Sequence, residues 1–278
     1  MAQIWKLLKS APPTAVFGMV VIVLYIFIAV FGPMLTPYGE SEIVGSQFIP
    51  RGEQGFILGT DNLGRDMLTR LIYGARNTIG IAFVTTCLAF LIGGVLGLLA
   101  TTLGGWADQL LGRLVDVLMA IPILIFALLI LTITGTSVPV LILVIAVLDS
   151  TRVFRLARSV SMNIVVLDFV EAARLRGEGT WWIITREILP NSMPPLVAEF
   201  GLRFCFVFLF ISALSFLGLG IQPPTADWGS MVRDNATLIT YGDITPLLPA
   251  AAIALLTVGV NFVVDWFLHK TSGIRDDK

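Results

Sequence analysis

Five stretches without a charged side chain, each close to the length of a membrane helix, most limit what this chain can fold into. They cover residues 10–39, 77–107, 117–148, 204–226 and 244–264. A helix needs about 20 mainly apolar residues to cross the hydrocarbon core of a bilayer. Apolar residues make up 56% of the chain and charged residues 13%, against a charged share of about 25% in soluble proteins. One soluble core could not bury that much apolar surface, so part of the solvent must be lipid.

The third stretch is too long for one ordinary span. Residues 132–139 within it combine small polar residues with Gly and Pro, which marks a turn. Dividing the stretch there predicts an all-α polytopic membrane protein with six transmembrane helices. Their predicted limits are 14–35, 77–104, 113–133, 138–156, 194–218 and 245–268. Five spans are the alternative, and they would place the two termini on opposite sides of the membrane.

Lysine and arginine give the expected orientation, because these residues favour the cytoplasmic side. With both termini inside, the inner segments hold 12 of them and the outer segments 5. The expected order is a cytoplasmic N-terminal segment (1–13), a first transmembrane helix (14–35), an extracytoplasmic insertion (36–76), a five-helix core (77–268) with a cytoplasmic loop (157–193), and a cytoplasmic tail (269–278).

The N-terminal apolar run exceeds the 7–15 residues of a signal-peptide core, and no small-residue cleavage site follows it, so we do not expect it to be a cleaved signal peptide. Residues 4–9 alternate bulky apolar and cationic groups. This pattern is typical of a short interfacial helix anchored by Trp5, or of a disordered basic flank. The insertion at 36–76 is expected to be ordered, because it contains apolar side chains that need burial: Phe48, Ile49, Phe56, Ile57 and Leu58. Its charged residues Asp61, Arg65 and Asp66 could form a local ion network.

The longest polar interruption between two apolar segments contains the run from Asp168 to Gly177. Asp168 is placed to cap a short helix whose first turn contains Glu171, where a carboxylate favours the helix dipole. Ala172 and Ala173 allow another surface to approach closely, and Gly177 permits the positive φ of a helix stop. So short a helix has little reason to be stable alone. It is expected to fit a groove on another subunit, with an ordinary connecting loop as the alternative.

Flanking residues complete the segment. Leu189-Pro190 is expected to close it before Pro194-Pro195 opens the fifth span. On the other side, Arg152, Arg155 and Arg158 recur every third residue and line roughly one side of a helix. They are interpreted as an anchor for lipid phosphates or as a basic patch that faces a partner.

The pattern Glu171-Ala172-Ala173, three residues, Gly177, and later Leu189-Pro190 resembles the cytoplasmic loop of ATP-binding-cassette importer permeases. Three further runs resemble the peptide, nickel and opine branch of that family, and in particular its second, C-type permease: LGTDNLGRD (58–66), RLIYGAR (70–76) and ALSFLGLGIQPP (213–224). The isoleucine often found two residues before Leu-Pro is Glu187 here, with Ile188 one position later.

The resemblance implies a type I importer permease fold in the bacterial cytoplasmic membrane. It implies a heterodimer with a second six-helix permease, two cytoplasmic ATPase subunits and an extracytoplasmic solute-binding protein. It assigns coupling to the ATPases to Glu171, Ala172, Ala173, Arg176, Gly177, Leu189 and Pro190. The chain has no G-x-x-x-x-G-K-[ST] loop, so no cofactor is expected in it, and ATP and magnesium are expected on the ATPase subunits. Gly93, Gly94 and Gly97 are then expected at close helix contacts.

Two other groups are candidates for function. Glu199 and Arg203 stand four residues apart within the fifth predicted span, and are interpreted as a mutual structural pair or as lining of the substrate path. Asp227, Trp228 and Gly229 lie in a loop expected outside. They are candidates for a contact with the binding protein or a gate, or for a structural Trp anchor.

The sequence therefore predicts a permease subunit of an ATP-driven, binding-protein-dependent importer that forms half of the path for a small solute. Short peptides are the expected class, with nickel chelates, opines, glutathione and oligosaccharides left open. The alternative is a secondary transporter with its own ion-coupled site, which the few intramembrane charges disfavour. One His and two Cys in apolar runs supply no metal or catalytic set, and a formal charge of −1 argues against nucleic-acid binding.

Overall fold

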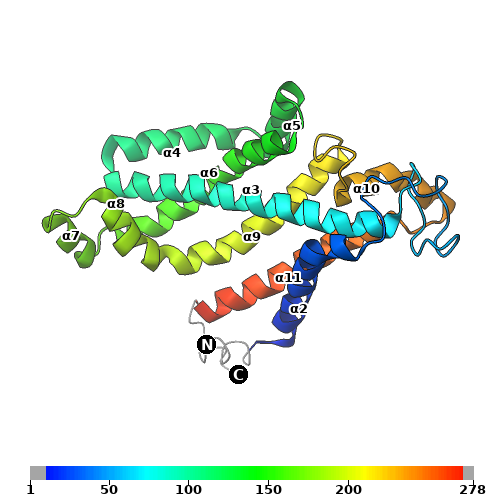
Figure 1. Cartoon of the computed structure of the whole chain (residues 1–278). Helices are drawn as coiled ribbons and strands as arrows, with labels where there is room; N and C mark the ends of the chain where they lie inside the picture. The colour runs from blue at the N-terminus through cyan, green and yellow to red at the C-terminus, as the bar shows by residue number, and fades with distance from the viewer. Residues whose placement is uncertain (1–10, 272–278) are drawn as a thin grey trace. The chain divides into compact units, whose positions relative to one another are not determined.

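The computed structural model describes residues 11–271, and these are helical apart from their connecting segments (Figure 1). The predicted interfacial helix at residues 4–9 and most of the predicted tail lie outside the described residues. The chain forms two compact units. Unit 1 comprises the residues up to Phe83, Thr136–Val138 and the residues from Cys205 onward, and unit 2 comprises Val84–Gly135 and Pro139–Phe204. The long helices α3 (Met67–Leu103) and α9 (Leu189–Phe216) contribute to both units.

In unit 1, α2 (Pro13–Leu35) packs along α11 (Leu247–Thr271), and α10 (Trp228–Asn235) and a 3₁₀ turn (η2, Ala236–Tyr241) precede α11 in the chain (Figure 1). A Cβ atom on Gly18 of α2 would collide with the carbonyl oxygen of Gly259 in α11, so the two backbones approach closely. The Tyr25 hydroxyl donates a 3.0 Å hydrogen bond to the Ala252 carbonyl. Small residues at such crossings are typical of helices that pack in lipid.

The loop between α2 and α3 is ordered, although it buries only part of its apolar residues. Ile49 and Phe56 are buried, whereas Phe48 is 40% and Ile57 68% exposed, so the expected burial of the last two is wrong. The buried Asp61 carboxylate holds the loop together. It pairs with Arg65 at 2.7 Å and Arg70 at 3.3 Å and also accepts backbone N–H bonds.

The expected ion network is thus present, but with different members. Asp66 accepts the backbone N–H of Thr69 at 2.8 Å, which places it at the start of α3 rather than in the network. Helix α3 begins at Met67, ten residues before the predicted limit. The charge of Arg76 ended the uncharged stretch, but the helix continues through Arg76 and through Arg70, whose ion pair with Asp61 allows the helix to contain it.

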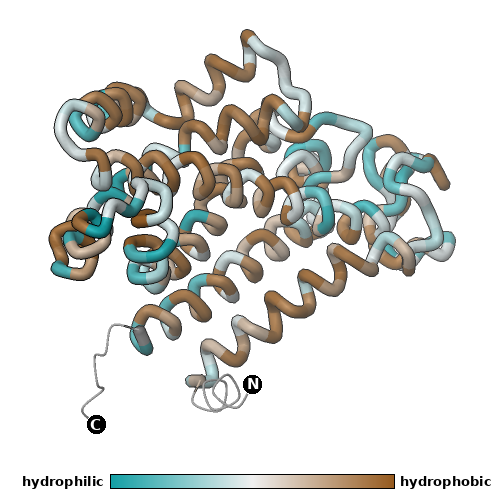
Figure 2. Tube along the Cα trace, turned by 60° about the vertical axis from the view of Figure 1, so that its left-hand side comes forward, coloured by the Kyte–Doolittle hydropathy of each residue, from teal (hydrophilic) through white to brown (hydrophobic). Residues whose placement is uncertain are grey.

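Unit 2 contains the C-terminal part of α3, from Val84, and the elements that follow it as far as the middle of α9. They are α4 (Gly105–Ala120), α5 (Ile123–Thr134), α6 (Val138–Ile164), α7 (Asp168–Leu175), α8 (Thr180–Ile183), a π-helical turn (η1, Ile184–Ile188) and the first half of α9. Figure 2 shows that hydrophobic residues follow the long helices of the chain, whereas hydrophilic residues gather in connecting segments.

A bend of 86° separates α4 from α5, so the predicted span 113–133 is not one straight helix. Ile121 has extended backbone angles (φ −89°, ψ 131°) and precedes Pro122. A proline disfavours helical angles in the residue before it, which explains the break. Within residues 11–271, four helices can cross a membrane by length and composition: α2, α3, the continuous helix Thr180–Phe216, and Leu247–Lys270. The bent pair raises the count to five, so the six predicted spans are not confirmed.

The fourth predicted span corresponds to α6, which is long enough at 27 residues. It carries Asp149, Arg152 and Arg155 near its middle and is not among the helices that qualify by composition.

Prolines do not divide the helix that includes α9. We expected Leu189-Pro190 to close the loop and Pro194-Pro195 to open a new helix, but helical backbone runs without a break from Thr180 to Phe216. The π-helical turn at Ile184–Ile188 ends two residues before Pro190. Such turns locally relax the hydrogen-bond register in which a proline cannot donate. The side chains of Asn191 and Ser192 donate to the carbonyl oxygens of Glu187 and Ile188, at 2.6 Å and 2.8 Å.

Candidate functional site

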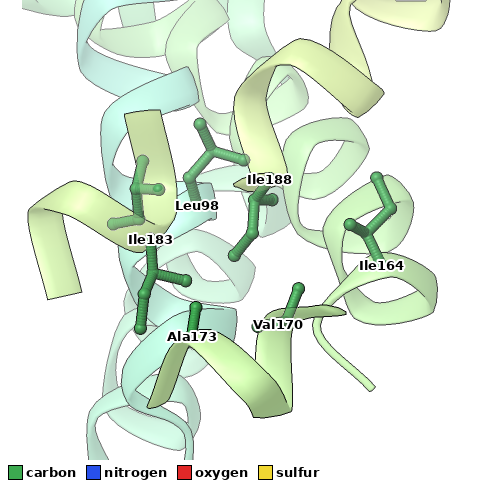
Figure 3. Packing of buried hydrophobic residues seen from close by; sticks show 7 residues of the cluster. Leu98, Ile164, Val170, Ala173, Ile183 and Ile188 are labelled. Atoms are coloured by element: carbon green, nitrogen blue, oxygen red, sulfur yellow. The ribbon is translucent and has the colours of Figure 1, made fainter. Parts of the chain in front are cut away.

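Helix α7 contains the Glu171-Ala172-Ala173 run and has two different faces. Val170 and Ala173 are fully buried, whereas Glu171 and Ala172 are exposed and Leu175 is 83% exposed. The buried pair belongs to a cluster with residues from α3, α6, α8 and η1: Leu98, Ile164, Ile183, Ile184 and Ile188. Figure 3 shows Leu98, Ile164, Ile183 and Ile188 near Val170 and Ala173. Burying a side chain of this size contributes about 1.5–3 kcal/mol. The short helix is therefore packed on one face, while Glu171, Ala172 and Leu175 on its other face are exposed.

The end of α7 is a Schellman motif. Gly177 has φ +80°, as predicted, and its N–H bonds to the Arg174 carbonyl at 2.9 Å. The Glu178 N–H bonds to the Ala173 carbonyl at 3.2 Å, which completes the motif. At the other end, the expected capping by Asp168 is wrong. Leu167 is the N-cap residue, without a side-chain hydrogen bond, and Asp168 lies in the first turn with Glu171, where both carboxylates favour the helix dipole.

Two arginines fasten α7 to neighbouring elements. Arg174 donates to the carbonyl oxygen of Thr102 at 3.2 Å, at the C-terminal end of α3. A cation at a helix C-terminus is electrostatically favourable. Arg176 lies 4.0 Å from Glu187 and 3.9 Å from Glu178, and its guanidinium is 5.9 Å from the centre of the Trp182 ring.

These contacts explain the departure seen at position 187. Glu187 is directed to Arg176, and the apolar position of the cluster is filled by Ile188, which is fully buried. Leu189 packs against the same cluster, whereas Pro190 is exposed. Of the residues assigned to coupling, Glu171 and Ala172 thus lie on the exposed face of α7, and Ala173 and Leu189 belong to the packing that holds it.

The arginines of α6 do not form a free basic patch. Arg158 binds Asp108 of α4 through two hydrogen bonds of 2.6 Å, and Arg155 binds Asp116 of α4 at 2.6 Å. Both interpretations made from the sequence, lipid anchoring and a partner-facing surface, overlooked these carboxylates. Asp108 and Asp116 stand eight residues apart and so lie on one face of α4, which is the signal that could have identified them.

A second set of charges lies within the helices of unit 2. Glu199 and Arg203 form the predicted pair, with Arg203 Nε 2.8 Å from Glu199 Oε1. Sequence reasoning did not include Asp149 of α6, whose Oδ1 is 3.5 Å from Arg203 Nη1 and whose side chain is fully buried. Asp149 directly ends an uncharged stretch, so its position was visible but its partner was not.

Asp227, Trp228 and Gly229 are buried in unit 1, which favours the structural alternative, while a contact with the binding protein or a gate stays a prediction. Asp227 caps α10 by accepting the Ser230 N–H at 2.8 Å and also accepts the Thr78 hydroxyl at 3.0 Å. Burial raises the pKa of Asp227, and these hydrogen bonds oppose that rise. Trp228 donates to the Leu71 carbonyl at 2.9 Å.

Helices α3 and α6 approach closely at two of the three predicted glycines. A Cβ atom on Gly97 would lie 2.7 Å from the Phe154 carbonyl oxygen and 2.8 Å from the Ala157 Cβ, and one on Gly93 would collide with the Ser150 carbonyl oxygen. A Cβ atom on Gly94 would contact nothing within 4 Å, so the expectation is wrong for that residue.

Comparison with known proteins supplies the class of this molecule. Residues 89–270 match the family described as binding-protein-dependent transport system inner membrane component. Residues 1–50 match the N-terminal TM domain of oligopeptide transport permease C. The first match covers more than half of the sequence, so the chain belongs to the family of inner-membrane components of binding-protein-dependent transport systems.

Curated relatives and one solved structure agree with that membership. The chain is 35% identical over 264 residues to the dipeptide transport system permease protein DppC of Alkalihalophilus pseudofirmus, covering 94% of this chain and 84% of the relative. It is 35% identical over 268 residues to the di/tripeptide transport system permease protein DppC of Pseudomonas aeruginosa, covering 94% and 86%. A chain of an amino acid ABC transporter crystallised with histidines shares the fold, with a TM-score of 0.54 at 20% identity over 72% of this chain and 94% of the other.

The predicted resemblance to importer permeases is therefore confirmed. The chain is a multi-pass inner-membrane permease subunit of an ATP-driven importer. Members of this family do not hydrolyse ATP themselves; the ATPase activity lies in separate subunits, and transport also needs a partner permease and a solute-binding protein.

Proposed function

We propose that this chain is the C-type permease subunit of an importer for short peptides, and that the exposed face of α7 docks on an ATPase subunit. The first part rests on the relatives, whose names specify dipeptide and di/tripeptide transport. The second rests on one observation: a short helix is fastened to four elements on one side while its Glu171 and Ala172 face outward. A surface held so firmly and left uncovered is suited to receive and transmit a displacement.

The proposed topology has six spans with both termini in the cytoplasm. It adds α6 to the four helices and the bent pair that qualify by composition. The charges of α6 do not prevent this, because Arg155 and Arg158 are neutralised by α4 and Asp149 faces Arg203. The insertion at 36–76 then lies outside, and α7 lies inside.

The proposed assembly contains a second six-helix permease, two cytoplasmic ATPase subunits and an extracytoplasmic binding protein. ATP and magnesium bind to the ATPase subunits, and no cofactor binds to this chain. Closure of the ATPases would move α7, and with it the cluster of α3, α6, α8 and η1 that carries it.

Co-purification of the whole importer tests the docking surface. Ala172→Trp places a bulky side chain on the exposed face without disturbing the cluster, and it should reduce the recovered ATPase at least about tenfold. The matched control is Asn163→Trp, an exposed position on α6 outside α7, which should retain the ATPase. Full recovery of the ATPase with Ala172→Trp would show that docking occurs elsewhere.

Two further measurements separate the other parts of the proposal. Protease or thiol-reagent mapping in sealed vesicles should reach residues 168–175 from the cytoplasmic side alone; reaction from the outside would overturn the orientation. Uptake of a labelled dipeptide by proteoliposomes that contain all subunits tests the substrate. A binding protein from the same operon that retains sugars or metal chelates, and no peptide, would exclude the peptide assignment.

A further inference from the structure

Three charged residues of unit 2 meet within the helices: Asp149 on α6, and Glu199 and Arg203 on α9. Arg203 lies between the two carboxylates, 2.8 Å from Glu199 Oε1 and 3.5 Å from Asp149 Oδ1. Their exposure differs in a way that matters. The Asp149 side chain is fully buried, whereas 16% of the Arg203 side chain and 22% of the Glu199 side chain are exposed.

The trio lies well inside the predicted membrane segments. Arg203 follows the predicted start of the fifth span by nine residues and Asp149 precedes the end of the fourth by seven. At 1.5 Å per helical residue, these offsets correspond to about 14 Å and about 10 Å from the cytoplasmic boundary. The two helices thus give a consistent depth.

At that depth the exposed atoms of the Glu199–Arg203 pair, called here its exposed edge, must face protein or water, because lipid tails cannot solvate a charge. The pair does not need a partner protein to complete it. Arg203 has carboxylates on two sides, and Asp149 fixes it from the buried side. The second Asp149 oxygen, Oδ2, is buried without a hydrogen-bond partner among the described residues, so burying the trio lowers the stability of the fold. Such a cost is typical of charges retained for function.

The exposed edge presents one positive and one negative group side by side. A short peptide with free termini carries the same two charges, and charged side chains add to them. We infer that Glu199 and Arg203 line the water-filled part of the translocation path and set its preference among peptides of different net charge, with Asp149 as a positioning residue for Arg203. This inference rests on the proposed peptide substrate.

The decisive experiment compares uptake of cationic, neutral and anionic tripeptides by the reconstituted importer. Glu199→Gln removes one negative charge, which leaves Arg203 balanced by Asp149 alone, and should shift the cationic-to-anionic uptake ratio toward anionic peptides. Arg203→Gln leaves a net negative edge and should shift it the other way, each by about fivefold or more, as expected for a unit charge close to the passing solute. Asp116→Asn, an exposed acid on α4, is the matched control and should not change the ratio.

A purely structural role predicts slower uptake of all three peptides with an unchanged ratio, and that result would overturn the inference. Wild-type uptake of the neutral peptide tests the proposed function separately. If the wild-type importer moves no peptide, the substrate assignment and the charge preference fail together, whereas exposure to water is still tested by thiol labelling.

Thiol labelling provides a second test that does not require transport. After Cys87→Ser and Cys205→Ala, a cysteine is introduced by Glu199→Cys or, as the control on another side of α9, by Val197→Cys in an apolar groove. A charged, membrane-impermeant reagent should modify the thiol at 199 at least about tenfold faster than the thiol at 197 in one of the nucleotide states. A thiol at 199 that reacts no faster than the control in every state would show that the pair does not face water.

Discussion

Alanine substitutions at two glycines of α3, three residues apart, should have different effects on stability. A Cβ atom at Gly97 would lie 2.7 Å from the Phe154 carbonyl oxygen and 2.8 Å from the Ala157 Cβ, whereas one at Gly94 meets nothing within 4 Å. Atoms in ordinary contact lie about 3.5–4.0 Å apart, so Gly97→Ala requires α3 and α6 to separate by about 1 Å. Overpacking of this kind costs about 1–3 kcal/mol.

Both substitutions lie in the same helix, so the change in helix propensity is common to them. Replacing a helical glycine by alanine gains about 1 kcal/mol of helix propensity at either position, so this gain cancels in the comparison. Gly94→Ala should therefore be more stable than the wild type, and Gly97→Ala less stable than Gly94→Ala by the packing cost of about 1–3 kcal/mol. The midpoint of thermal unfolding in detergent measures this order, with the folded fraction at each temperature determined by size-exclusion chromatography. Equal midpoints for the two variants would refute the close approach of α3 and α6.

Three further changes test separate contacts. A double-mutant cycle of Asp108→Asn and Arg158→Gln should give a coupling energy of up to about 1 kcal/mol that falls in high salt, because the pair is partly exposed; no coupling would mean that α4 is not held there. Trp228→Phe should destabilise the chain by about 0.5–1.5 kcal/mol in thermal unfolding, since the part-buried hydrogen bond to the Leu71 carbonyl is lost, and an unchanged midpoint would contradict that hydrogen bond. Asp61→Asn should cost about 3–5 kcal/mol and increase proteolysis of the 36–66 loop, because two buried arginines lose their counter-charge; unchanged proteolysis would show that the ion network does not order the loop.

Hydropathy located most of the long helices because the absence of charge is a direct requirement of lipid. It could not locate the bend at Pro122 or the continuity of the helix through Pro190, Pro194 and Pro195. The first depends on the backbone of the residue before a proline. The second depends on a π-helical turn and on side chains that donate to neighbouring carbonyls. Neither feature alters the hydrophobic pattern.

Features of α7 that depend on neighbouring residues were predicted better than contacts between distant residues. Gly177 adopts positive φ as expected, because a helix stop needs that conformation within a few residues. The partners of Arg155 and Arg158 were missed, and only one of the two partners of Arg203 was predicted. The missed partners lie 39 to 54 positions away in the sequence. The burial of Asp227, Trp228 and Gly229 likewise depends on residues far along the chain, such as Leu71 and Thr78. A single sequence does not show which distant helices pack against each other.

The path from α7 to the charged pair is short and mostly rigid, which bears on how a permease of this kind can be driven. Ile183, Ile184 and Ile188 share one buried cluster with Val170 and Ala173, so α7 packs directly on the start of the helix that contains α9. From Ile188 to Arg203 the helix rises about 22 Å without a break. The segment between them holds Pro190 and Pro194-Pro195, which remove backbone donors and soften it. If α7 docks on an ATPase subunit as proposed, a displacement of α7 would reach Glu199 and Arg203 through a helix softened between Pro190 and Pro195, and would act on the Asp149–Arg203 contact, which at 3.5 Å is longer than a strong ion-pair hydrogen bond.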